Sequence, residues 1–189
     1  MPVATCAIGF RIKSGWATTV LLAGPAKTPR VLDRRVTQLA DPNDPETRQP
    51  YHAGLGTHDA RAAQDVKRLI RAVERFARHS IRNLIVDYRA AGHRVRGAGL
   101  VVGSVIDPAR IPNEHIRAHA EEGRLFRTVV EEGLRACRLR ARVMVEKDLY
   151  VAEARLRRRV TALGEAVPGP WRAEEKAAAL AAWVVLRLV

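Results

Sequence analysis

The pattern of apolar and polar positions predicts three successive strands at the start of the chain. Residues 3–12 and 16–23 are apolar and rich in β-branched side chains, as buried strands are, and residues 30–39 alternate like a half-exposed strand. Bends at 13–15 and 24–29 separate them. Because strands joined by short turns pair antiparallel, the pattern predicts a three-stranded meander.

Beyond the meander the pattern changes to alternating helices and strands. Apolar residues recur every three or four positions over residues 60–91, which predicts one long helix that ends at Gly92. A glycine-containing apolar run at 95–106 predicts a buried strand. The same criteria predict a helix, a strand, a basic helix and an apolar final helix at residues 114–137, 141–149, 150–163 and 172–188. The sequence thus predicts a single α/β domain over residues 1–189, with a mixed five-stranded sheet flanked by helices.

A long loop at residues 40–58 interrupts this order. It is rich in Pro, Gly, Asp and Asn and has no apolar period. Loops of this length are usually functional or packed as compact units. We therefore take Tyr51, His52 and His58 as the first candidates for ligand contact.

The size and composition are those of a globular domain. The 189 residues are 47% hydrophobic, and no apolar run reaches the roughly 18 residues that a membrane span requires. The start of the sequence does not resemble a secretory signal, so a cytoplasmic protein without a membrane partner is expected. Cys6 and Cys137 have no metal-type spacing and are expected to be small, buried apolar residues in a reducing compartment.

The net charge of +13 favours a phosphate-rich partner such as nucleic acid. Arginine has a planar fork that matches phosphate oxygens, and Arg155, Arg158 and Arg159 are expected to form one positive helical surface. The alternative is that GC-rich coding, which favours Arg and Ala, produces the charge without any binding role. The nine Phe, Trp and Tyr residues give little support for stacking of bases.

Two histidines have the spacing of metal ligands. His115 and His119 lie four positions apart and share one face of a predicted helix, where they could bind zinc if a third ligand joined them. Acidic and arginine residues surround them, so we favour a solvated helix face and assign no metal ligand.

The order of elements resembles the ribonuclease H-like superfamily, in which an antiparallel meander continues into parallel strands. Within it, AIGFRIKSGWATTVLL at 7–22 resembles the first hairpin of the Holliday-junction resolvase branch. The segment EEKAAALAAW at 174–183 resembles the closing helix of that branch. The similarity of order covers nearly the whole chain, whereas the similarity of motif covers these two segments.

The resemblance implies an acidic cluster that holds two Mg²⁺ ions for hydrolysis. The chain departs from it at Arg11, which stands where the family has a first-strand aspartate. The fourth strand ends without a carboxylate, and the final helix keeps Glu175 but has Ala178 in place of its acidic partner. We therefore expect that two-metal nuclease activity is absent and that Glu146 or Asp148 pairs with Arg11.

The leading hypothesis is a protein that binds a phosphate-rich partner without metal-dependent cleavage. Arg11 and the turn residues Lys13 and Ser14 would bind phosphate, because turns like this one hold phosphates in related folds. The arginine-bearing helix and the loop histidines would add further contacts.

Two alternatives remain open from the sequence. The first is a Mg²⁺-dependent nuclease or hydrolase that uses Glu146, Asp148 and Glu175, assisted by His52 or His58. The second is a homo-oligomeric assembly protein whose apolar final helix forms the interface, although the same helix could instead be sandwiched inside one domain.

Overall fold

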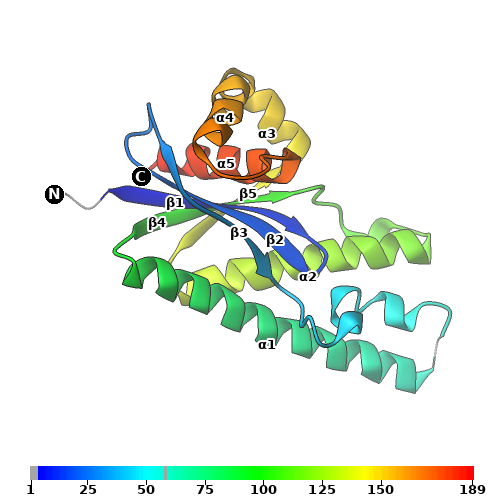
Figure 1. Ribbon diagram of the computed structural model, residues 1–189. Coiled ribbons are helices and arrows are strands. Elements are labelled where there is room, and N and C mark those ends of the chain that lie inside the picture. Colours follow the sequence, from blue (N-terminus) through cyan, green and yellow to red (C-terminus); the bar gives the residue numbers. More distant parts are fainter. Residues whose placement is uncertain (1–3, 58) are drawn as a thin grey trace.

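A five-stranded mixed sheet forms the centre of the computed structural model, which describes residues 4–57 and 59–189 (Figure 1). Its order is β3-β2-β1-β4-β5, with β1 antiparallel to β2 and parallel to β4, β2 antiparallel to β3, and β4 parallel to β5. The strands are Thr5–Lys13 (β1), Trp16–Ala23 (β2), Arg30–Gln38 (β3), Arg94–Val102 (β4) and Arg140–Val145 (β5). The predicted meander and the predicted parallel continuation are both confirmed.

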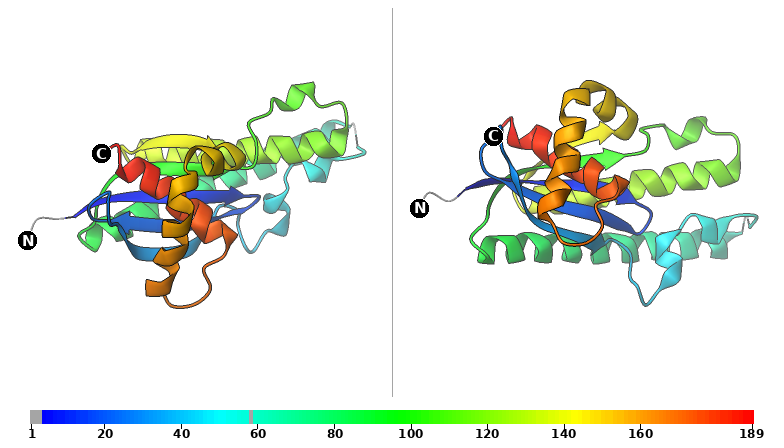
Figure 2. Two further views of the ribbon diagram at one scale, coloured as in Figure 1. Left: turned by 90° about the horizontal axis from the view of Figure 1, so that it is seen from above. Right: turned by 45° about the horizontal axis from the view of Figure 1, so that its top comes forward.

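Helices cover both faces of the sheet (Figures 1 and 2). One face carries α1 and α2, and the other carries α5, which packs on β1, β2 and β4 and has α4 beside it. The helices are Ala60–Ala90 (α1), Glu114–Ala136 (α2), Glu146–Ala152 (α3), Arg157–Leu163 (α4) and Ala173–Leu186 (α5). None of the helices in the described residues is both long and apolar enough to cross a membrane.

The central strand β1 is buried on both faces because its alternate side chains enter two separate apolar clusters. Ile8 and Phe10 belong to the cluster that includes α1 and α2, whereas Ala7 belongs to the cluster around α5. Gly9 allows the closest approach: a Cβ placed there would lie 1.7 Å from the Ala178 carbonyl oxygen. The glycine in the first-strand motif thus lets α5 pack directly on the backbone of β1.

The apolar final helix is sandwiched within the chain. Residues 177–186 of α5 are all buried by the sheet and the surrounding helices. Trp183 anchors the helix further by donating its indole N–H to the Ala26 carbonyl, at 2.8 Å. Because α5 has no free apolar face, an oligomer interface built on that face does not agree with the structure.

Some predicted boundaries are wrong, and one expected helix is divided. The fourth strand ends at Val102 rather than at residue 106, and the fifth ends at Val145 rather than at residue 149. The expected basic helix at 150–163 is split into α3, a short turn and α4. Glu146 and Asp148 therefore lie in the first turn of α3, where the positive end of the helix dipole favours carboxylates.

The long loop is not without structure. It contains two short 3-10 helices, Pro45–Arg48 (η1) and His52–Gly54 (η2), and Thr47 is fully buried. Figure 2 shows that the loop lies beside the first turns of α1 and α2, where both helices extend past the sheet. The loop is thus a packed unit, as its length suggests.

Candidate functional site

Arg11 and Glu146 form an ion pair at the end of the central strand. The guanidinium Nη2 donates to Glu146 Oε2 at 2.6 Å, and Nη1 donates to the Ile12 carbonyl at 2.8 Å. Arg11 is buried and Glu146 is partly exposed. The expectation that one of the two fifth-strand carboxylates pairs with Arg11 is confirmed for Glu146.

The sheet order explains why these two residues meet. Arg11 lies opposite Val101 of β4, and the next β4 residue, Val102, lies opposite Val145 at the end of β5. Glu146 follows immediately as the first residue of α3. Because β1, β4 and β5 are parallel, their carboxyl ends share one edge of the sheet, where open α/β sheets commonly bind ligands.

The other acidic candidates have separate places. Glu175 accepts a hydrogen bond from the Arg172 backbone N–H at 2.9 Å, which caps α5, and lies 3.5 Å from Arg34 Nη1. Glu174 lies 3.7 Å from Lys13 Nζ. Asp148 is exposed and lines a different hollow beside Met144 and Val184. The three predicted catalytic carboxylates are thus not brought together with one another in any contact of the described residues.

A basic cleft of about 270 Å³ opens at this edge, between the β1–β2 turn, the segment after β4 and α2. Its charged lining consists of Arg11, Lys13, Arg124 and Arg127, and none of the described residues that line it is acidic. Arg124 lies 3.0 Å from Glu121, and Arg127 lies 3.5 Å from Glu131. Such partly exposed pairs are weak, about 0–1 kcal/mol, so a phosphate could compete for the arginines.

The predicted phosphate turn forms one wall of this cleft. Ser14 lines it together with Lys13. Gly15 follows with a φ of +86°, a left-handed conformation that favours glycine. The Gly15 carbonyl accepts hydrogen bonds from the backbone N–H groups of Leu39 and Ala40, at 2.8 and 2.9 Å. These bonds tie the turn to the start of the long loop and fix its position.

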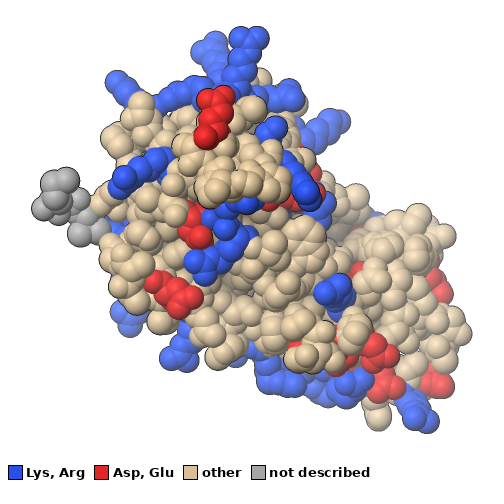
Figure 3. Space-filling view, in the orientation of Figure 1, with Lys and Arg blue, Asp and Glu red and all other residues tan. Residues whose placement is uncertain are grey.

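A second basic surface lies over α3 and α4, where Figure 3 shows many Lys and Arg side chains. Arg155 and Arg159 line a hollow there, and Arg158 is exposed without lining it. Arg159 packs over the Trp183 ring at 4.7 Å and donates to the Lys27 carbonyl. The structure therefore brings two of the three predicted arginines to one hollow, and one of these is held by intramolecular contacts.

The loop histidine His52 lies against α2 rather than at the Arg11–Glu146 pair. Its Nδ1 is 2.7 Å from Oε1 of Glu122, a residue that is fully buried. Burial raises the pKa of the Glu122 carboxyl, and the hydrogen bond from His52 opposes that shift. Partial burial and the neighbouring imidazoles of His52 and His115 lower the pKa of His119. The other loop candidate, His58, lies outside the described residues.

Local sequence features carry a partial signal for this histidine cluster. His52 was a ligand candidate and the pair on α2 had metal spacing, but nothing local indicated that the loop packs on that helix. Glu122 was missed, although its position three residues after His119 puts both on one helix face.

Comparison with known proteins finds similarity at the level of structure. No protein-family model matches the chain, and no curated protein matches it in sequence. The structure of Thermus thermophilus RuvC in complex with Holliday junction substrate aligns with a TM-score of 0.60 at 11% identity, covering 97% of this chain and 94% of that chain. A second T. thermophilus RuvC structure aligns with a TM-score of 0.57 at 10% identity, covering 97% and 95%.

The chain has the ribonuclease H-like fold. The alignment spans nearly both chains, so the likeness includes the meander, the parallel strands and the closing helix. At this level of identity the likeness concerns the fold, and the chemistry must be argued from the residues of this chain.

Proposed function

We propose that this ribonuclease H-like chain binds branched or otherwise phosphate-dense nucleic acid at the basic cleft, without two-metal cleavage. One observation carries the proposal. Arg11, near the end of β1, is paired with Glu146 and lines a cleft in which every charged lining group among the described residues is basic. One of the neighbours in fold, T. thermophilus RuvC, was solved with a Holliday junction, which makes DNA the first partner to test.

Charge at the cleft supports phosphate rather than metal as the ligand. Two divalent cations need several carboxylate oxygens within about 2–2.6 Å of each ion. Here the nearest acidic group, Glu146, is engaged by the guanidinium of Arg11. A cation in the cleft would be repelled by the other basic groups that line it, Lys13, Arg124 and Arg127, whereas an anion would be attracted. The residues present do not fit a pair of Mg²⁺ ions at this position.

The cleft has the chemical groups that phosphate recognition requires. Arginine and lysine side chains supply charge, and arginine can also bind phosphate oxygens in a bidentate manner. Lys13 and Arg124 are 38% and 52% exposed and can reach a ligand, whereas the buried Arg11 forms part of the fixed wall. Contacts of this kind set the affinity and the position of nucleic acid without reading its sequence.

The competing hypotheses receive less support. A nuclease built from Glu146, Asp148 and Glu175 would need these carboxylates to converge, and each has a different environment. An assembly role through the final helix would need an exposed apolar face, and α5 is buried along residues 177–186. The surface over α4, with Arg155, is the main rival position for nucleic-acid contact.

Binding to a four-way DNA junction, measured by fluorescence anisotropy over a series of salt concentrations, tests the proposal. The affinity should fall with rising salt, because binding releases counterions from phosphate. Lys13→Ala and Arg124→Ala should each weaken binding and reduce the salt slope by about 1. Arg78→Ala is a matched control, since Arg78 is an exposed arginine of α1 that does not line the cleft.

The same DNA incubated with Mg²⁺ separates binding from cleavage. Intact junction after incubation, together with retained binding in EDTA, is the expected result. Mg²⁺-dependent cleavage that is lost in Glu146→Gln would overturn the absence of nuclease activity. Equal loss of affinity in the Arg78→Ala control, or loss confined to Arg155→Ala, would remove the cleft as the binding surface.

A further inference from the structure

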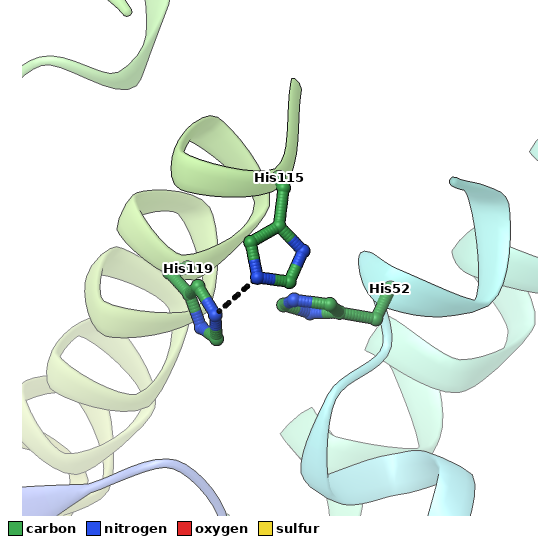
Figure 4. A group of neighbouring side chains, drawn as sticks. All are labelled: His52, His115 and His119. Carbon is green, nitrogen blue, oxygen red and sulfur yellow. Dashed lines mark hydrogen bonds between the residues drawn. The ribbon is translucent and has the colours of Figure 1, made fainter. Parts of the chain in front are cut away.

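We infer that His52, His115 and His119 form a binding site for a single Zn²⁺ ion. Figure 4 shows the three imidazoles turned toward one another, with His52 contributed by η2 and the other two by α2. One potential ligand atom from each residue lies within 4.8 Å of the other two. The site does not include the Arg11–Glu146 pair, although it borders the basic cleft, which His119 also lines. The inference does not depend on the proposed binding of nucleic acid.

The spacing of the nitrogens agrees with tetrahedral coordination. Zinc binds histidine nitrogen at about 2.0–2.1 Å, so two nitrogens on a tetrahedral ion lie about 3.3–3.4 Å apart. The Nε2 atoms of His115 and His119 are 3.2 Å apart. The centroid of the His52 ring lies 5.0 Å from that of His115 and 4.4 Å from that of His119. Small side-chain movements would bring all three nitrogens to a common ion.

Glu122 provides a second and independent observation. Its side chain is fully buried, and Oε2 has no hydrogen-bond partner within residues 4–57 and 59–189. The two carboxylate oxygens lie near the Nδ1 atoms of two rings, which are the nitrogens that would not bind the ion. His52 Nδ1 is 2.7 Å from Oε1, and His119 Nδ1 is 3.7 Å from Oε2. A carboxylate that holds the outer N–H of a metal-bound histidine is a recurrent feature of zinc sites, because it fixes the tautomer and the ring orientation.

The buried face of His52 is consistent with this arrangement. In the tautomer in which Nδ1 donates to Glu122, the other nitrogen, Nε2, is an acceptor. That Nε2 is buried and has no hydrogen-bond partner in the described residues. A metal ion would bind the lone pair of Nε2. Without a partner, the burial of this nitrogen costs free energy.

The ligand set selects the class of metal. Imidazole nitrogens suit Zn²⁺ and its transition-metal neighbours, whereas Mg²⁺ and Ca²⁺ require oxygen ligands. Three protein ligands leave a fourth position for a solvent molecule, and His115 and His119 are exposed toward solvent. Because His52 belongs to the long loop and the other ligands to α2, the bound ion would cross-link these two segments.

Zinc titration of tag-free protein tests the inference. Wild-type protein should bind one equivalent of Zn²⁺ and should unfold at a higher temperature when loaded. Co²⁺ bound in its place should give the intense visible absorption of a tetrahedral site. His52→Ala and His115→Ala should each weaken zinc binding at least tenfold, and Glu122→Gln should weaken it about 10- to 100-fold.

His79→Ala is the matched control, because His79 is an exposed histidine of α1 that is hydrogen-bonded to Asn83 at 2.9 Å. It should bind zinc like the wild type. His115 is exposed, so its loss should leave the far-ultraviolet circular dichroism unchanged and separate metal binding from folding. Substoichiometric zinc in the wild type, equal affinity in His115→Ala, or an equal loss in His79→Ala would overturn the inference.

Discussion

The Arg11 and Glu146 side chains meet at 2.6 Å, although 135 positions separate them in the sequence. The pair lies where the carboxyl ends of β1, β4 and β5 share one edge of the sheet. The contact joins β1 to the first turn of α3, so it is both an electrostatic feature of the cleft and a connection between two elements of the fold.

Removal of Arg11 should destabilise the protein. Arg11→Met leaves the partly buried Glu146 carboxylate without its partner, and we expect a loss of about 1–3 kcal/mol in the free energy of unfolding. The value is set below that of fully buried pairs because Glu146 is 30% exposed and water can solvate it. Urea unfolding of Arg11→Met, Glu146→Gln and the double variant would measure the coupling, and strictly additive effects would show that the pair contributes none.

The close approach of α5 to β1 predicts that Gly9 tolerates no side chain. Gly9→Ala would place a Cβ 1.7 Å from the Ala178 carbonyl oxygen, so α5 would have to move away from the sheet. We expect a loss of about 3 kcal/mol or more, or failure to fold. Gly123→Ala is the control: a Cβ there meets no atom of the described part of the chain within 4 Å, and alanine favours a helix by about 0.5–1 kcal/mol relative to glycine. Similar melting temperatures for the two variants would contradict the packing argument.

The two cysteines should differ in reactivity. Cys6 is buried, and burial raises the pKa of its thiol, so less thiolate forms in the folded protein than in the unfolded chain. Cys137 is only partly buried, so the expectation of burial is confirmed for Cys6 and wrong for Cys137. Alkylation followed by mass spectrometry should label Cys137 first, and Cys6 only after urea unfolding.

The sign of the Cys6 shift also predicts a dependence of stability on pH. As the pH rises above the thiol pKa of the unfolded chain, the unfolded state loses its proton before the folded state does, so the free energy of unfolding falls. Cys6→Ala should reduce that alkaline fall, although its loss of packing also lowers stability at neutral pH. Rapid labelling of Cys6 in the native protein at neutral pH would contradict this account.

Arg34 should hold the segment before the final helix in place. Its guanidinium donates to the carbonyls of Pro170 and Pro168, at 2.6 and 2.9 Å, and lies near Glu175. Arg34→Ala should lower the free energy of unfolding by about 1 kcal/mol, because the two carbonyls would lose a fixed donor and bind water instead. The segment 164–172 would then be held less firmly, so proteolysis there should increase. Arg30→Ala changes an exposed arginine of the same strand and should leave the digestion pattern unchanged.

Local pattern determined much of the fold. Alternation in the first three strands and the three-to-four spacing of α1 and α2 depend on neighbouring residues alone, so the order of elements could be predicted. The apolar circumference of α5 indicated burial in the same way. The resemblance of the first-strand motif to the Holliday-junction resolvase branch led to the further expectation that Arg11 pairs with a carboxylate, and that pair is present.

Only the tertiary structure decided which residues meet. Glu146 rather than Asp148 reaches Arg11, because β5 ends at Val145 and α3 turns Asp148 outward. The loop histidine His52 joins the α2 pair because the long loop folds onto that helix, a contact over 63 positions or more that no local period encodes. Sequence periodicity reports which face of an element is buried; the partner of each polar side chain depends on the order and the ends of the packed elements.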